Sequence, residues 1–256
     1  MAEQQSKKMD GMVAIITGAS RGLGRAIANA FAAEGAKVVV SARRKSPTGL
    51  SGTAVETAEQ IRSNGGEAMA LTCDVTEEEQ VMAMVGQTLD RYGRIDVLVN
   101  NAGVMVLGET LLDISPEQWD QSVAANLRGP YLCCRAVLPT MIEQKRGSII
   151  HIGSRMGSDH EQGGGTLYSA TKAAVHMFSL CLADEVREHN IAVNILSPGS
   201  LRTEGSAAIP WTQRDWEQRV EPGAVGPSAV YLALQDASTF TGQLVMRAEF
   251  GETWGV

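Results

Sequence analysis

Short apolar runs alternate along the chain with longer segments in which apolar residues recur every three or four positions. The short runs, rich in valine and isoleucine, predict buried β-strands, and the longer segments predict amphipathic helices. Seven strands are expected, at residues 12–16, 37–41, 68–71, 95–99, 148–152, 191–196 and 243–246. Helices are expected between them, including residues 23–34, 53–63, 77–92 and 171–188.

The regular alternation of strand and helix predicts an α/β fold with a parallel sheet. Parallel neighbours need a crossover connection, and helical crossovers cover both faces of the sheet. A sheet covered on both faces explains why the predicted strands are almost wholly apolar. We find no internal repeat or linker, so we expect one domain over residues 1–256, with residues 1–8 as a disordered tail.

Two segments lack a regular pattern. Residues 43–52 contain Pro47, Gly49 and Gly52, which predict an exposed loop. Residues 199–226 carry Trp211 and Trp216 among small and charged residues and are compatible with a mobile flap.

Composition and charge exclude several classes of protein. The net charge of -7 argues against a nucleic-acid or anionic-membrane partner, because such partners need a concentrated basic surface. The four cysteines show neither metal-site spacing nor the density of a disulfide scaffold, and the histidines show no metal-ligand spacing. The polar N-terminal segment lacks an apolar core, and no run approaches the roughly 20 apolar residues of a membrane span. We therefore expect a cytoplasmic protein without a metal.

A glycine-rich turn follows the first predicted strand and leads directly into a helix, in Thr17-Gly-Ala-Ser-Arg-Gly-Leu-Gly24. Gly18 permits a tight turn, Gly22 lets the backbone approach a pyrophosphate, and Gly24 allows close packing of helix on sheet. The helix N-terminus attracts phosphate charge. This context predicts a dinucleotide site.

The spacing GxxxGxG occurs together with Asn100-Asn-Ala-Gly103 after the fourth strand and Tyr168-Ser-Ala-Thr-Lys172 at a later helix. With these motifs the chain closely resembles the classical short-chain dehydrogenase/reductase family over about residues 9–247. The resemblance implies a doubly wound Rossmann fold with a seven-stranded parallel sheet. It also implies a small-molecule carbonyl or alcohol substrate and a homotetramer, with a dimer as the alternative.

The second strand points to the form of the cofactor. It ends in Ser41-Ala-Arg-Arg-Lys45, without the acid that binds the ribose hydroxyls at NAD-selective sites. Arg43 is placed to meet a 2′-phosphate, and Arg21 in the glycine turn is placed to close on it. NADP(H) is therefore expected rather than NAD(H), whereas Arg44 and Lys45 are interpreted as solvated loop charges.

The resemblance assigns further contacts with the cofactor. Asp74 and Val75 are expected at the adenine edge, although Asp74 is equally placed to cap a helix. The full set of expected cofactor-binding residues is Gly18, Ser20, Arg21, Gly22, Leu23, Gly24, Arg43, Asp74, Val75, Asn100, Ala102, Gly103, Tyr168, Lys172, Pro198, Gly199, Leu201 and Thr203.

Reduction of a carbonyl leaves a developing alkoxide that needs a proton donor. Tyr168 and Lys172 lie four residues apart and share one helix face, so the lysine ammonium is expected to favour the phenolate. The resemblance implies that Ser154 hydrogen-bonds the substrate oxygen and that Asn126 holds a water linking Lys172 to solvent. No GxSxG motif surrounds Ser154, which argues against acyl-transfer chemistry.

The favoured interpretation is an NADP(H)-dependent enzyme that interconverts a ketone and a secondary alcohol. Three alternatives stay open: a 3-oxoacyl-carrier-protein-type reductase, which Arg128 and Arg135 would serve, a non-catalytic NADP(H)-binding regulator, and a dinucleotide-dependent epimerase or dehydratase. Only 53 residues follow Thr203, few for the substrate domain of the last class. Substrate identity is expected to depend on residues 105–112, 156–167 and 205–220.

Overall fold

The computed structural model describes residues 7–44, 49–159 and 164–256 of the chain. It contains one parallel sheet, in the order β3-β2-β1-β4-β5-β6-β7, which confirms the predicted seven-stranded doubly wound fold. The strands are β1 (Val13–Thr17), β2 (Lys37–Ala42), β3 (Glu67–Thr72), β4 (Val97–Asn100), β5 (Gly147–Ile152), β6 (Ile191–Ser197) and β7 (Leu244–Met246).

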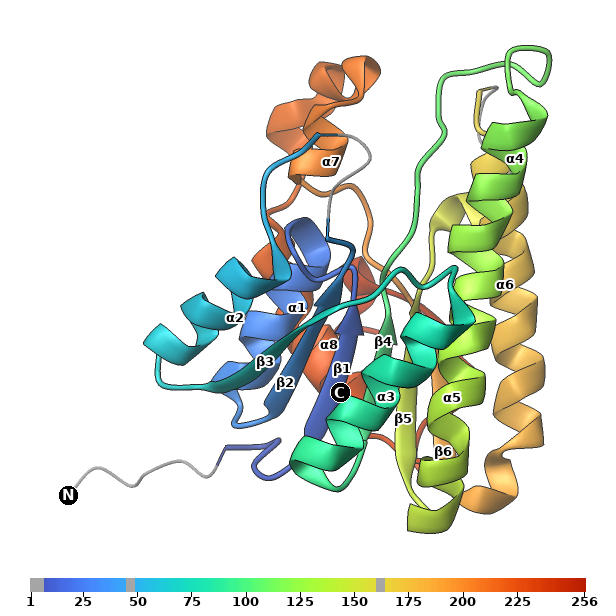
Figure 1. Ribbon diagram of the computed structural model, residues 1–256. Helices are drawn as coiled ribbons and strands as arrows, with labels where there is room; N and C mark the ends of the chain where they lie inside the picture. Colours follow the sequence, from blue (N-terminus) through green and yellow to red (C-terminus); the bar gives the residue numbers. More distant parts are fainter. Residues whose placement is uncertain (1–6, 45–48, 160–163) are drawn as a thin grey trace.

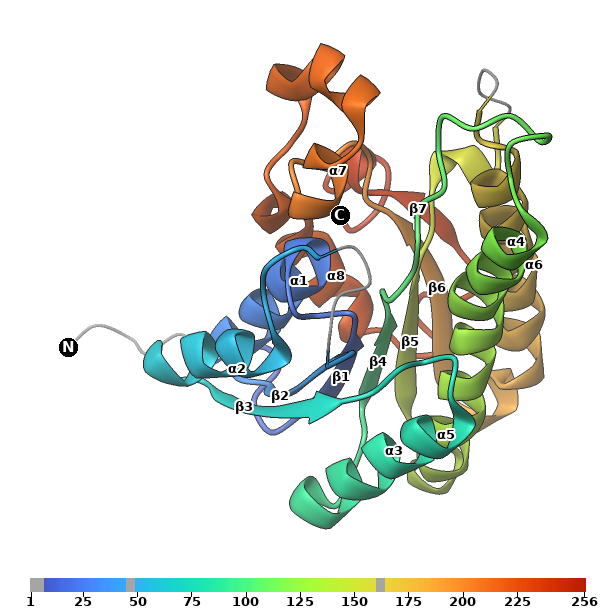
Figure 2. The same cartoon turned by 45° about the horizontal axis from the view of Figure 1, so that its top comes forward.

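Helices cover both faces of this sheet (Figures 1 and 2). The longer ones are α1 (Gly22–Ala33), α2 (Ala54–Ser63), α3 (Glu78–Tyr92), α4 (Pro116–Val123), α5 (Gly129–Gln144), α6 (Thr166–Glu185) and α8 (Gly226–Ala233). A π-helical turn, η1 (Ala124–Arg128), joins α4 to α5. Side chains on α1, α2 and α8 share one apolar cluster, and those on α3, α5 and α6 share the other.

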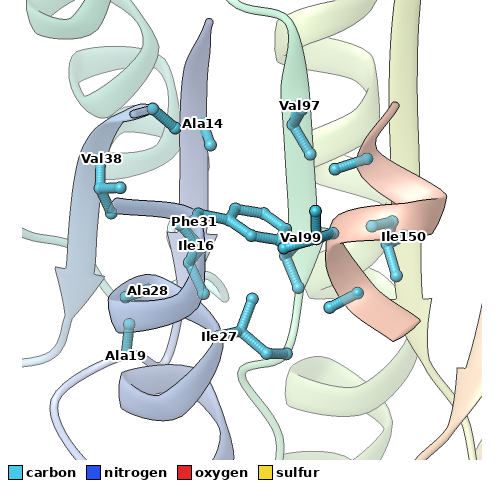
Figure 3. Packing of buried hydrophobic residues seen from close by; sticks show 14 of the residues in the cluster. Ala14, Ile16, Ala19, Ile27, Ala28, Phe31, Val38, Val97, Val99 and Ile150 are labelled. Atoms are coloured by element: carbon cyan, nitrogen blue, oxygen red, sulfur yellow. The ribbon is translucent and has the colours of Figure 1, made fainter. Parts of the chain in front are cut away.

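Alternate residues of each central strand enter opposite clusters. Ile16 of β1 faces Ile27 and Phe31 of α1 (Figure 3), whereas the neighbouring Ile15 packs on the other face. All of these side chains are fully buried. This double burial is the physical reason why the strand sequences show no polar alternation.

The strand order reverses between β1 and β4. The chain proceeds outward in one direction through β2 and β3 and in the other through β5, β6 and β7. In open parallel sheets, a ligand crevice lies beyond the carboxyl ends of the strands at such a reversal. The glycine turn after β1 and the segment after β4 meet there.

The expectation that residues 199–226 are irregular was wrong. This segment forms α7 (Glu204–Ala207) and two 3₁₀ helices, η4 (Pro210–Gln218) and η5 (Pro222–Val225). Tertiary contacts hold them, such as the hydrogen bond from Thr212 Oγ1 to the Ser206 carbonyl (2.6 Å). Helices this short show no periodic signal in the sequence. Figure 1 shows α7 and the start of α4 at the same end of the molecule.

The other two irregular segments are described in part. Residues 43, 44 and 49–52 form no helix or strand, and residues 45–48 of that predicted loop lie outside the described residues. The predicted tail lies outside them as well, except for Lys7 and Lys8. The backbone N–H of Lys8 donates to the Glu34 carboxylate at 3.2 Å.

Candidate active site

The glycine turn between β1 and α1 has no room for side chains. Gly18 and Gly22 have φ angles of 65° and 53°, which favour glycine. A Cβ on Gly18 would lie 2.8 Å from Ala102 Cα, and one on Gly24 would lie 2.6 Å from the Gly18 carbonyl oxygen. The turn therefore lies directly against the segment that follows β4.

Thr17 and Asn101 bind these two segments together. Asn101 Nδ2 donates to the carbonyls of Thr17 (2.8 Å) and Gly18 (3.1 Å). Thr17 Oγ1 accepts from the backbone N–H groups of Asn101 and Ala102, both at 3.1 Å. Sequence reasoning selected Asn100 and missed Asn101. The Asn-Asn pair was visible, but only the fold shows which amide faces the turn.

The segment after β4 contains three of the expected residues, Asn100, Ala102 and Gly103, and their surroundings differ. Asn100 is buried, and its Nδ2 donates to Cys134 Sγ at 3.5 Å. Gly103 lies against Asn126, because a Cβ there would be 2.8 Å from Asn126 Oδ1. The backbone of this segment is thus held from both sides, by Thr17 and by Asn126.

Two arginines mark the side of the crevice at the end of β2. Arg21 Nη1 is buried and has no hydrogen-bond partner within the described residues. The guanidinium of Arg43 lies 3.9 Å from the carboxylate of Asp74. Asp74 also accepts hydrogen bonds from the backbone N–H and hydroxyl of Thr76, at 3.1 and 2.9 Å. Asp74 therefore closes a turn with Thr76 and pairs with Arg43, and the expectation that it caps a helix was wrong, because the N-cap of α3 is Glu77.

The segment after β6, which carries other residues expected near the cofactor, lies against the glycine turn. A Cβ on Gly22 would lie 3.4 Å from Thr203 Cβ, so the glycine turn meets the segment after β6. Thr203 caps α7 by accepting from the Ser206 backbone N–H at 3.0 Å. Further hydrogen bonds and packing contacts involve Ser20, Leu23, Val75, Pro198 and Leu201. Gly199 has a φ of 78°.

Ser154, Tyr168 and Lys172 come together at the end of β5. The side-chain hydroxyls of Ser154 and Tyr168 interact, and this interaction lowers the pKa of Tyr168. The ammonium of Lys172 lies 5.6 Å from the centroid of the Tyr168 ring and donates to the Ile152 carbonyl at 2.7 Å. Tyr168 and Lys172 are one helical turn apart on α6, as their spacing predicted.

Burial dominates the electrostatics of this group. It raises the pKa of Tyr168 to about 12, against the opposing effect of the hydrogen bond with Ser154. It lowers the pKa of Lys172 to about 8. The expected depression of the Tyr168 pKa by Lys172 is outweighed by burial, so the phenol is protonated at neutral pH. The protonated phenol is the form that donates a proton.

Asn126 sits in the π-helical turn η1 and is 2 % exposed. Its Oδ1 accepts from the Val104 backbone N–H (2.8 Å), and its Nδ2 donates to the Val104 carbonyl (2.9 Å) and Thr171 Oγ1 (3.1 Å). A longer bond, at 3.3 Å, goes to Ser122 Oγ. In the described part of the chain, none of the side-chain hydrogen bonds of Asn126 goes to Lys172 itself. Asn126 fastens the segment after β4 to α6.

His176 is a site neighbour that sequence reasoning missed. Its Nε2 accepts from the backbone N–H of Ser154 at 3.3 Å. The only signal in the sequence was its spacing of four residues from Lys172. This signal is weak, because a histidine at this spacing is more often a helix residue without a role in catalysis.

The three segments predicted to select the substrate approach one another. The backbone N–H of Gly108 donates to the Gly164 carbonyl at 2.7 Å, which joins the first segment to the second. A Cβ on Gly205 would lie 3.8 Å from Met105 Cε, so the first segment also approaches α7. Met156 Cε lies close over Gly165. Residues 160–163 of the second segment lie outside the described residues.

Residues 7–44, 49–159 and 164–256 contain no cluster of three or more histidine, cysteine or carboxylate side chains placed to hold a metal ion. No helix within the described ranges is long and apolar enough to cross a membrane.

Comparison with known proteins identifies the family. Residues 12–214 match the short chain dehydrogenase family model. An uncharacterized oxidoreductase of Staphylococcus saprophyticus is 34 % identical over 248 residues, which cover 96 % of this chain and 99 % of the relative. A 3-oxoacyl-[acyl-carrier-protein] reductase of Synechocystis is 41 % identical over 192 residues, 75 % of each chain.

The solved structures agree. A metagenomic short-chain oxidoreductase in complex with NADP superposes with a TM-score of 0.76 at 35 % identity, covering 93 % of this chain and 98 % of the other. The chain belongs to the short-chain dehydrogenase/reductase family and is an oxidoreductase of that family.

Proposed function

We propose that the protein is an NADP(H)-dependent oxidoreductase that interconverts a ketone and a secondary alcohol. The observation that carries this proposal is the junction of Ser154, Tyr168 and Lys172, in which a serine hydroxyl and a tyrosine phenol interact beside a buried ammonium. A carbonyl oxygen in this place would meet two hydroxyl groups and a nearby positive charge.

The residues of the crevice fit a nicotinamide dinucleotide phosphate. The glycine turn admits no Cβ at Gly18 or Gly24, as a backbone that cradles a pyrophosphate requires. The buried Nη1 of Arg21 has no hydrogen-bond partner in the described residues. Within the same residues Arg43 forms one salt bridge, with Asp74 at 3.9 Å. A 2′-phosphate would satisfy both guanidinium groups. The NADP complex of the metagenomic relative supports the same preference.

Bound nicotinamide supplies or accepts the hydride, and the side chains manage the proton. In ketone reduction, Tyr168 donates its proton to the substrate oxygen as the carbon is reduced, and the hydroxyl of Ser154 hydrogen-bonds that oxygen. The charge of Lys172 lowers the cost of the tyrosinate that this transfer leaves. The proton relay expected of Asn126 gains no support from its side chain, whose polar atoms are engaged.

A second candidate is reduction of a 3-oxoacyl group carried by a protein. The Synechocystis relative favours it. The two arginines considered for docking an acidic carrier are already engaged, since Arg135 pairs with Glu78 and Arg128 donates to the Thr76 carbonyl. This engagement weakens a basic docking patch, and we place the carrier-bound substrate second.

One experiment separates these functions. The purified protein is offered a panel of ketones, secondary alcohols and a 3-oxoacyl thioester with NADPH or NADH, and the absorbance of reduced cofactor is followed. Turnover of free ketones with NADPH, lost in Tyr168→Phe, is the expected result. Turnover confined to the thioester would favour the second candidate. Binding of NADPH without turnover of any panel member would favour the regulator.

We also propose a homotetramer in the cytoplasm, with a dimer as the alternative assembly. Exposed apolar side chains on α4, α5 and α6 support association, with Met177 61 %, Tyr131 45 % and Trp119 39 % exposed. The exposed free thiol of Cys181 fits a reducing compartment. Mass measurement in solution tests the assembly.

A further inference from the structure

The imidazole ring of His176 packs against two glycines, Gly153 and Gly157. It is 5 % exposed and stands one helical turn beyond Lys172 and two beyond Tyr168 on α6. A Cβ on Gly153 would lie 2.6 Å from His176 Nε2, and one on Gly157 would lie 2.7 Å from its Cε1. Glycines on both sides of Ser154 therefore let the ring approach the backbone that carries the Ser154 hydroxyl.

The hydrogen bonds define the state of the ring. A backbone N–H only donates, so the His176 Nε2 that accepts from Ser154 at 3.3 Å must be unprotonated. The neutral ring then carries its proton on Nδ1, which lies 3.4 Å from Ser158 Oγ. A doubly protonated ring would place a donor against the donor of Ser154.

The charged and titratable neighbours favour this neutral state. Lys172 faces the ring from the same helix, and His151 faces it from β5. Burial, with the positive charge of Lys172 as a smaller cause, lowers the pKa of His176 to about 4. The imidazole is therefore a stable acceptor throughout the neutral range.

We propose that His176 is a positioning residue of the catalytic centre, whose neutral imidazole holds the Ser154 backbone so that the serine hydroxyl stays in contact with Tyr168. This inference rests on the proposed function. Ser154 follows β5, whereas Tyr168 and Lys172 lie on α6, so the two parts of the centre belong to separate elements. The bond from Ser154 to His176 joins them through the backbone. The hydroxyls of Ser154 and Tyr168 are then already in place when a substrate oxygen binds between them and the nicotinamide.

The test compares substitutions at residue 176 with a matched control on the same helix. His176→Leu keeps much of the volume and removes the acceptor, whereas His176→Gln places an amide oxygen near the position of Nε2. Ser179→Ala is the control, since this buried hydroxyl of α6 hydrogen-bonds His151 at 2.9 Å. Measured are kcat, KM for ketone, the dissociation constant of NADPH and Tm.

The expected pattern separates positioning from stability. His176→Leu should lower kcat on the order of 10- to 100-fold, the effect of displacing a catalytic group by about 1 Å. NADPH affinity should change by less than about twofold, because the glycine turn is remote from Ser154. His176→Gln should recover most of the lost kcat. Ser179→Ala should lower Tm and leave kcat unchanged. If His176→Leu does not fold, His176→Asn replaces it, because that amide is too short to reach the Ser154 nitrogen.

The outcomes are distinguishable. A parent enzyme with Tyr168-dependent turnover, together with a folded His176→Leu that keeps kcat within twofold, overturns the inference alone. Equal losses in folded His176→Gln and His176→Leu overturn it too. A parent protein without Tyr168-dependent turnover overturns the proposed function and the inference with it.

Discussion

Ser154 and Tyr168 interact through their side-chain hydroxyls, although one follows strand β5 and the other lies in the first turns of helix α6. The contact forms a pair of hydroxyl groups at the carboxyl edge of the sheet, beside the ammonium of Lys172. The chemistry proposed for the protein depends on this pair.

Tyr168→Phe removes the proposed proton donor and little else. We expect the rate of ketone reduction to fall about 100- to 10,000-fold, the range for loss of a general acid. The dissociation constant of NADPH should stay nearly unchanged, because Arg21, Arg43 and the glycine turn are intact. Tyr131→Phe, which removes the same oxygen from an exposed position on α5, is the control and should keep full activity. Substantial residual turnover in Tyr168→Phe would remove Tyr168 from the proton-donor role.

Arg43→Ala tests the form of the cofactor. The loss of a charge-assisted contact with a 2′-phosphate should weaken NADPH binding by about 10- to 100-fold, whereas NADH binding should change little. Titration of both cofactors by fluorescence measures the two dissociation constants. Arg44→Ala, the exposed neighbour, serves as the matched control and should leave both constants unchanged. Equal losses for NADPH and NADH would place Arg43 outside the phosphate site.

Asn101→Ala tests the clamp on the glycine turn. The substitution removes two hydrogen bonds to the carbonyls of Thr17 and Gly18, worth about 1 kcal/mol each. We expect NADPH affinity to fall about tenfold or more, since the turn that should cradle the pyrophosphate is no longer held. Asn64→Ala on the exposed end of α2 is the control. An unchanged NADPH affinity would show that the turn holds its shape without Asn101.

The pKa of Lys172, lowered to about 8 by burial, predicts the pH dependence of reduction. Below that value the ammonium is charged and stabilises the tyrosinate left by proton transfer, and above it the charge is lost. The kcat for ketone reduction should therefore fall as pH rises through about 8. The arginine of Lys172→Arg stays charged around pH 8, so the inflection in kcat near pH 8 should be absent from this variant, whatever the absolute value of its kcat. Persistence of the inflection in that variant would assign it to another group.

Buried histidines predict a loss of stability in acid. Burial lowers the pKa of His151 to about 3 and that of His176 to about 4, below the ordinary value of 6.5. Below pH 6.5 the folded protein thus binds fewer protons than the unfolded chain. The stabilising contribution of each neutral ring is complete above pH 6.5 and is lost as pH falls through the folded pKa. Urea unfolding at several pH values should show this decline, with a shallower slope in His151→Asn. If the slope in His151→Asn equals that of the parent protein, His151 does not contribute to the loss of stability in acid.

The expected elements and the observed ones agree closely for the central strands and differ at the short helices. Isoleucine and valine runs such as residues 191–196 need burial on both faces, and a parallel sheet with helical crossovers satisfies that need. The glycine turn and the Tyr168–Lys172 spacing are local patterns, so they identified the dinucleotide crevice and one face of α6. The helices α7, η4 and η5 have no such local pattern, because contacts like that of Thr212 with Ser206 hold them.

The sequence by itself determined the strand-helix alternation, the glycine turn and the four-residue spacing on α6, because each depends on residues close together in the chain. Tertiary structure alone decided that Asn101 rather than Asn100 holds the glycine turn, that Asn126 uses its amide to fasten the segment after β4, and that His176 meets Ser154. Each of these joins residues from different elements. It also decided the ionisation of Tyr168, because the desolvation that raises its pKa arises only when separate elements pack around the ring.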